Sequence, residues 1–105
     1  MINVSFYYGK GNFCSGFLIE GHAGFCVHGY DIVCAGVSSA AQMCCNGITD
    51  VLGVDVQICC EDAVLSLRTS SRNVSVQAFL EALRLHISLL QDRYKENITL
   101  KVVEE

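Results

Sequence analysis

Cys34 is the residue whose setting in the sequence most favours covalent catalysis. It closely follows Asp31, a good helix N-cap because its carboxylate can accept the unpaired N–H groups of a first helical turn. Those N–H groups and the helix dipole favour negative charge, and such settings lower a thiol pKa from ~8.5 to about 3.5–7.5. Because the thiolate is the reactive form, Cys34 is the candidate nucleophile. The spacing also leaves open a buried structural cysteine, since cysteine is among the most buried residue types.

His22 is the candidate general base for this nucleophile, because it ends a predicted strand among small residues. A strand end and a helix start can bring two side chains together beside a sheet. An imidazole within hydrogen-bond distance of the thiol accepts its proton and later donates it to the departing amine. The spacing is equally compatible with a solvated loop histidine, and His28 is a competing base in the same loop.

Ser38 lies one helical turn after Cys34, on nearly the same helix face, and could support the site by a hydrogen bond or pack beside it. No Gly-x-Ser-x-Gly elbow surrounds this serine, which argues against a serine hydrolase. The adjacent cysteines at 44–45 and 59–60 do not resemble a zinc site, whose ligands are usually separated by two to four residues. We therefore expect neither a metal nor a cofactor.

The composition is that of one small domain, with 105 residues, seven cysteines and a formal net charge of −4. We expect a single domain spanning residues 1–105. The seven Lys and Arg residues are scattered, so we expect no direct nucleic-acid binding. The N-terminus lacks a basic start with a long apolar run, and we expect no apolar stretch long enough to span a membrane. These features predict a cytoplasmic protein with free thiols and no membrane partner.

The pattern of apolar residues predicts the elements that would position Cys34 and His22. Alternation of apolar and polar residues predicts strands at residues 2–8, 13–20, 54–60, 63–68 and 98–103. Helical spacing predicts helices at residues 32–52 and, with Ser75 as the cap, from there to about Lys95. The order ββαββαβ, dominated by hairpins, predicts an α+β fold. It would be a small layered sandwich of two helices on a mostly antiparallel sheet. Residues 21–30 have no sustained period and are predicted to form a long loop.

The second predicted helix has two apolar faces, which bears on the oligomeric state. Its core stripe comprises Val76, Leu80, Leu83, Ile87, Leu90 and Tyr94. Roughly opposite lie Ala78, Ala82, Leu85 and Leu89. A second apolar face indicates burial between layers or a subunit interface. Because so small a domain gains from further burial, we expect a homodimer.

The sequence resembles the bacterial ribosomal-processing cysteine protease family, Prp. The resemblance is carried by Gly21-His22-Ala23-Gly24 and by the run from Gly29 to Ser38, which contains Asp31-Ile32-Val33-Cys34-Ala35. It extends to the element order and covers essentially the whole chain. Gly36 is a mild departure, since the family more often has alanine at this position.

The resemblance implies a cysteine endopeptidase with His22 as general base and Cys34 as nucleophile. Asp31 matches the family's acidic position beside the cysteine and is interpreted as a cap and orienter. Family members are homodimers that remove an N-terminal extension from a large-subunit ribosomal protein, the twenty-seventh of the bacterial series, after an aromatic residue. The loop that would close over this extended peptide includes Ala23, Gly24, Gly29 and Tyr30.

Two functions of other classes stay open at this point. One is a non-catalytic dimeric module that binds a peptide during ribosome assembly, which needs no activated thiol. The other is a redox sensor that pairs Cys34 with Cys26 in a reversible disulfide. Selective alkylation of Cys34 near neutral pH would favour the protease over the module.

Overall fold

The chain folds as predicted in the order ββαββαβ. The computed structural model describes residues 1–21, 31–61 and 63–105, with residue 31 described by its backbone alone. Within these residues the elements are β1 (Ile2–Tyr8), β2 (Cys14–Glu20), α1 (Asp31–Asn46), the π-helical segment η1 (Gly47–Val51), β3 (Gln57–Glu61), β4 (Val64–Arg68), α2 (Val74–Arg93) and β5 (Ile98–Glu104).

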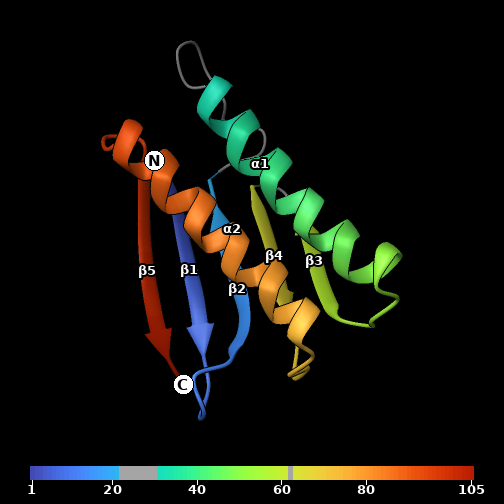
Figure 1. Cartoon of the computed structure of the whole chain (residues 1–105). Helices are drawn as coiled ribbons and strands as arrows, with labels where there is room; N and C mark the ends of the chain where they lie inside the picture. The colour runs from blue at the N-terminus through green and yellow to red at the C-terminus, as the bar shows by residue number, and fades with distance from the viewer. Residues whose placement is uncertain (22–30, 62) are drawn as a thin grey trace.

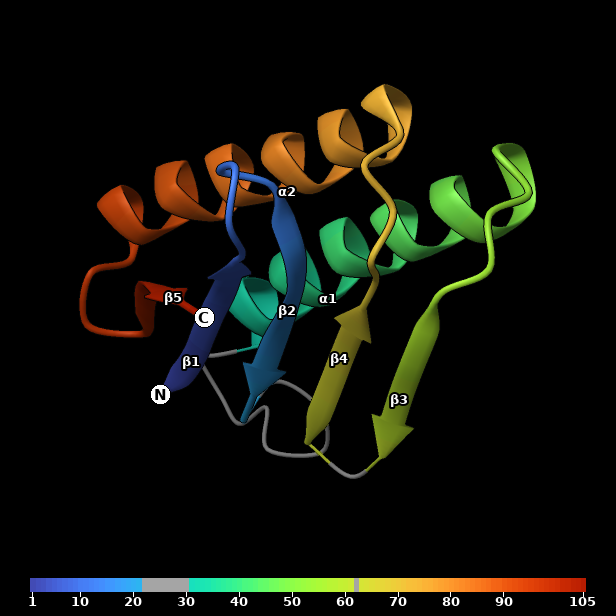
Figure 2. The same ribbon diagram turned by 90° about the horizontal axis from the view of Figure 1, so that it is seen from below.

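The strands form one mixed sheet in the order β3-β4-β2-β1-β5. Antiparallel pairing joins β1 to β2, β2 to β4 and β4 to β3, whereas β5 runs parallel to β1. Both helices cover the same face of this sheet, so the domain has two layers (Figures 1 and 2). The predicted α+β fold with a mostly antiparallel sheet is confirmed.

The core lies between the helices and the sheet, where the alternating strand residues meet the helical stripes. Phe6 of β1 and Phe17 of β2 are opposite one another, with ring centroids 5.8 Å apart. The predicted stripe of α2 is confirmed by its buried residues, which are Val76, Leu80, Leu83 and Ile87.

Two helix boundaries differ from the prediction. Asn73, rather than Ser75, caps α2: its side-chain oxygen accepts hydrogen bonds from the backbone N–H groups of Ser75 at 2.8 Å and Val76 at 3.2 Å. The first helix begins at Asp31 and changes to a π-helix after Asn46. Val51, the last residue of this π-helical segment, is 77% exposed.

Within the described residues, one helical stretch could cross a membrane by length and composition, although no such stretch was expected. Residues Ile32–Val51 have a mean hydropathy of 1.2 and are 44% buried inside the protein. In this fold the stretch is α1 with η1, and its inward residues belong to the core. A core helix of this kind meets the same criterion, so the stretch is weak support for a membrane span.

Gly36 and Gly47, which interrupt this helical stretch, have different surroundings. A Cβ atom at Gly36 would lie 3.8 Å from Leu90 Cδ1, an ordinary contact. A Cβ atom at Gly47 would lie only 2.5 Å from Phe79 Cε1, so the ring would have to move. We expect Gly36→Ala to raise the free energy of unfolding by up to ~1 kcal/mol, because alanine favours helix.

We expect Gly47→Ala to lower the free energy of unfolding by about 1–2 kcal/mol through displacement of the Phe79 ring. Urea unfolding of both variants measures these changes. In a Phe79→Leu background the penalty at position 47 should shrink. A loss of stability in Gly36→Ala, or a gain in Gly47→Ala, would contradict this description of the two sites.

Candidate active site around Cys34

Cys34 lies in the first turn of α1, which confirms its predicted position at a helix start. The residue is only 1% exposed and belongs to the hydrophobic core together with Val33 and Val37. The site therefore combines the two settings that the sequence left open: a thiol near helix N–H groups and a cysteine within the core. A peptide carbonyl can reach Cys34 only after the groups that cover the residue have moved.

The chain just before His22 lies against the residues that precede β1 and β4. Gly21 follows the last residue of β2, and its N–H donates a hydrogen bond of 2.7 Å to the carbonyl of Ala63, just before β4. Gly21 has a φ of 85°, and a Cβ atom there would lie 2.6 Å from the carbonyl oxygen of Met1. A side chain at position 21 therefore needs both an unfavourable backbone and a rearranged N-terminus.

Ala63 contributes a positioning contact that sequence reasoning missed. It adopts a φ of 61° and is buried, although alanine rarely adopts a left-handed conformation. No residue-type signal distinguishes such an alanine, since glycine and asparagine are the usual markers. Its carbonyl fixes Gly21, so the turn between β3 and β4 determines where β2 ends.

Most of the predicted site residues lie outside the described residues. These are His22, Ala23, Gly24, Gly29 and Tyr30, as well as the competing base His28 and the loop cysteine Cys26. Asp31 begins α1, but its side chain also lies outside the described part. The roles of these residues stay predictions from the sequence.

Ser38 lies on α1 at a groove that starts beside the candidate nucleophile. The groove has a volume of about 720 Å³ and runs from Ala35, the neighbour of Cys34, to Val51. Ser38 is half-buried in its wall, and Phe79 of α2 also lines it. Ser38 thus stays a candidate supporting residue whose side chain lies at a groove next to the site.

The remaining described cysteines fall into a buried and an exposed group. Burial raises the pKa of Cys44 to about 12. Burial and the nearby Cys60 raise the pKa of Cys45 to about 11. Burial also raises the pKa of Cys14, whereas Cys59 and Cys60 are exposed on β3. In residues 1–21, 31–61 and 63–105, no three His, Cys, Asp or Glu side chains gather where they could hold a metal ion.

The buried thiols of Cys44 and Cys45 predict a loss of stability in alkali. Their pKa values in the folded protein lie above the ~8.5 of an unfolded thiol. The stability that the two protonated thiols contribute is therefore fully present below about pH 8.5. It is lost as the pH rises towards the folded-state pKa values of about 11 and 12. At pH 10 each thiol should lower the free energy of unfolding by about 2 kcal/mol. Urea unfolding at pH 7.5 and 10 tests this, and Cys44→Ala should reduce the difference.

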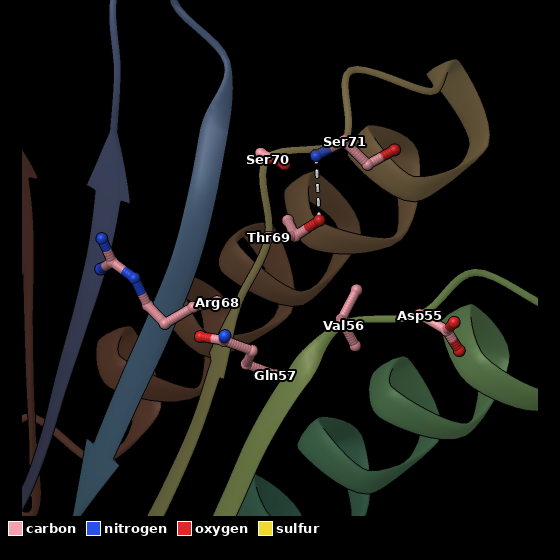
Figure 3. Close-up of a pocket in the computed structure, with 7 residues that line it drawn as sticks. All are labelled: Asp55, Val56, Gln57, Arg68, Thr69, Ser70 and Ser71. Atoms are coloured by element: carbon pink, nitrogen blue, oxygen red, sulfur yellow. Dashed lines mark hydrogen bonds between the residues drawn. The ribbon is translucent and has the colours of Figure 1, made fainter.

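A separate hollow lies at the opposite end of the sheet, where β3 begins and β4 ends. It has a volume of about 510 Å³, and its lining includes Asp55, Gln57 and Arg68 (Figure 3). The Arg68 side chain points away from Asp55, and its guanidinium donates hydrogen bonds to both carboxylate oxygens of Glu105 at 2.8 and 2.6 Å. Its charge is therefore engaged outside the hollow, and we assign no chemistry to this hollow.

Residues 1–99 match the family model described as cysteine protease Prp. Among curated proteins, none matches the chain. Solved structures share its whole architecture. A ribosomal processing protease Prp of Staphylococcus aureus, in complex with a substrate peptide, is 25% identical with a TM-score of 0.89, covering 97% of this chain and 99% of that one.

Two further structures agree with this match. The same Staphylococcus aureus protease with a covalently linked product peptide is 26% identical with a TM-score of 0.86, covering 97% of this chain and 99% of that one. The protein SMU.848 of Streptococcus mutans is 28% identical with a TM-score of 0.85, covering 100% of this chain and 96% of that one. The match thus extends over almost every residue of these chains.

Proposed function

The chain belongs to the Prp family of ribosomal-processing cysteine proteases, and we propose that it removes the N-terminal extension of a large-subunit ribosomal protein, the twenty-seventh of the bacterial series. In this proposal Cys34 is the nucleophile and His22 the general base. The single observation that carries the assignment is the place of Cys34 in the first turn of α1, because a thiolate is favoured at a helix N-terminus.

The proposed reaction is acyl transfer in two steps. His22 accepts the thiol proton, and the Cys34 thiolate attacks the scissile carbonyl carbon, so that a C–S bond forms. The C–N bond then breaks as His22 protonates the departing amine. Next, His22 takes a proton from a water molecule, whose oxygen attacks the thioester and restores the thiol. Backbone N–H groups of the first turn of α1 are suited to stabilise the oxyanion of both intermediates.

The remaining predicted residues have roles in holding the substrate and the base. Asp31, the first residue of α1, would cap the helix and orient the base. Ala23, Gly24, Gly29 and Tyr30 would form a loop that closes over the extended peptide and excludes water from the thioester. We also propose that the enzyme acts in the cytoplasm, without direct contacts to nucleic acid or membrane.

Mass spectrometry of the organism's own ribosomal protein, incubated with the purified enzyme, tests the proposed substrate. The expected result is one cleavage, after an aromatic residue of the N-terminal extension. A ribosomal protein left intact by an enzyme that cleaves other peptides would overturn the substrate assignment alone. The same incubation with Cys26→Ala should give undiminished cleavage, since a protease does not need the disulfide of a redox sensor.

The burial of Cys34 is the observation that favours the alternative function, a non-catalytic peptide-binding module. Thiol alkylation distinguishes the protease from the module only if the exposed cysteines are removed first. Cys59 and Cys60 would react with the reagent whichever function is correct. In a Cys59→Ser, Cys60→Ser background, the protease predicts rapid labelling of Cys34 near neutral pH when substrate peptide is absent. Labelling no faster than that of buried Cys44 would support the module.

A homodimer is the proposed state of the enzyme, because the second apolar stripe of α2 is exposed. Its four residues are Ala78, Ala82, Leu85 and Leu89, of which the two leucines are 61% and 57% exposed. A groove of about 530 Å³ between α1 and α2 adjoins this stripe, with Met43, Ala82 and His86 in its wall. His86 is exposed at this groove.

Analytical ultracentrifugation should detect a dimer of the wild type and a monomer of Leu85→Glu, since a buried charge at the interface costs several kcal/mol. The exposed Val74 at the start of α2 provides the matched control, and Val74→Glu should leave the dimer intact. A monomeric wild type, or a dimeric Leu85→Glu, would exclude this face as the interface.

A further inference from the structure

The strand β3 forms one edge of the sheet and is exposed along its whole length. The strand order places β3 outside β4, and all five of its residues are solvent-exposed. A strand that pairs on one side leaves a row of N–H and C=O groups without ladder partners on the other. In the described part of the chain, the ladder of β3 is formed with β4 alone.

This edge lacks the features that usually protect edge strands from pairing. Lysine, proline and bulges are common protections, and β3 has the sequence Gln-Ile-Cys-Cys-Glu. The opposite edge, β5, includes Lys101 in the middle of the strand and packs against α2. Of the two edges, β3 is therefore the one built to accept another strand.

The strand β3 ends at the same end of the sheet as the candidate nucleophile. Figures 1 and 2 show α1 beginning near β2 and running over β4 and β3, whereas α2 crosses the sheet from β5 over β1 and β2. Because β2 and β3 are both antiparallel to β4, they end at the same end of the sheet, where α1 begins (Figure 1). A strand added to β3 would thus run beside α1, towards the end that holds Cys34.

The helix-facing side chains of β3 leave room for a bound segment. Ile58 pairs in register with Leu67, and Cys60 with Leu65, so both point to the face that the helices cover. Their partners on β4 are buried, yet Ile58 is 41% exposed and Cys60 is also exposed. An extended segment on β3 would bury Ile58 and give its own alternate side chains an apolar contact.

We propose that the edge of β3 binds the peptide substrate as an additional strand, which delivers the scissile bond towards Cys34. This deepens the proposed function, on which it rests, by naming the surface that holds the substrate's backbone. The charges suit a neutral or basic segment rather than an acidic one. Between residues 55 and 67 the sequence contains Asp55, Glu61 and Asp62 but no Lys or Arg.

A scan of N-methylated peptides tests this proposal without altering the protein fold. The probe is a synthetic peptide that spans the cleavage junction of the organism's own ribosomal protein, with one backbone N–H methylated at a time. Binding to the Cys34→Ala variant is measured by calorimetry. Only every second residue of an added strand bonds the edge, so affinity should fall about tenfold or more at alternate positions. Uniform losses, or losses in one contiguous block, would overturn the proposal.

Amide hydrogen exchange of the same variant provides the second measurement. Peptide at saturation should slow exchange in residues 57–61, whereas the β5 amides should be unaffected. Saturating peptide without protection of β3 would overturn the proposal, while cleavage by the wild type would still support the proposed function. Protection of β3 that rises with protein concentration in the absence of peptide would also overturn it, because the edge would then bind a second copy.

Discussion

Cleavage of the ribosomal protein is expected to fall at least about a thousandfold when Cys34 is replaced by alanine, because no other described cysteine can replace it. Burial raises the pKa of Cys14, Cys44 and Cys45, so their thiols stay protonated at neutral pH. Cys59 and Cys60 are exposed but lie on the far edge strand β3. Rates of product formation, measured by mass spectrometry, give the ratio directly.

Cys34→Ser is the companion variant, since it preserves the size of the side chain and should bind the substrate peptide with wild-type affinity. Its hydroxyl is a far weaker nucleophile at neutral pH, so cleavage should be lost. Cys59→Ser is the matched control and should cleave at the wild-type rate, because Cys59 is exposed and alternates with Cys60 along β3, so that it points to the face of the sheet without helices. Unchanged cleavage by Cys34→Ala would remove Cys34 from the mechanism.

His22→Ala extends the same prediction to the proposed base, with an expected loss of about a hundred- to ten-thousandfold. His86 on α2 offers a matched histidine, and His86→Ala should retain wild-type cleavage, since it lies at the outer groove between the helices. Equal losses in the two variants would indicate damage to the fold rather than to the base. Wild-type rates in His22→Ala would transfer the role to another group, with His28 as the next candidate.

The fold could be predicted from the sequence wherever one face of an element is buried. The period of two in β1 and the stripe of α2 both reflect contact with the core, and both are confirmed. The cap of α2 was misplaced because Ser75 and Asn73 both favour an N-cap, and only Asn73 has its oxygen in reach of the first turn. The π-helical end of α1 left no signal, since its residues continue a helical period.

The site could be predicted in part, and the missing parts have a common physical origin. The type of Cys34 and its place at a helix start are local properties, whereas its burial depends on how α1 packs on the sheet. Likewise, the left-handed conformation of Ala63 accompanies a hydrogen bond with Gly21, a residue distant in the sequence. The exposure of β3 depends on the strand order, because alternation in this strand is the same at an edge as in the centre.

The burial of Cys34 and the openness of β3 together suggest how specificity could arise in so small a domain. A peptide, unlike a small reagent, reaches a thiol within the core only by displacing the groups above it, which requires binding free energy from elsewhere on the peptide. The β3 edge is a surface on which the peptide backbone could gain that free energy. Short peptides, which would be cleaved readily by an exposed thiol, should therefore be poor substrates of this enzyme.

Gly16→Ala is expected to cause the largest loss of stability, about 3–5 kcal/mol in the free energy of unfolding. Gly16 lies in the central strand β2 with a φ of 149°, a region that is essentially restricted to glycine. A Cβ atom there would lie 2.0 Å from the backbone carbonyl oxygen of Leu67, and the two paired strands cannot separate without loss of ladder hydrogen bonds.

The open position at Gly16 also makes room for a contact across the sheet. Tyr7 and Arg68 flank it on the neighbouring strands, and the Arg68 guanidinium lies 4.4 Å from the Tyr7 ring centroid. Urea unfolding of Gly16→Ala measures the loss, and Gly53→Ala is the control. Gly53 has a φ of 68° with nothing within 4 Å, so this variant carries strain without a clash and should lose only about 1 kcal/mol. Equal losses in the two variants would show that the sheet adapts to a side chain at position 16.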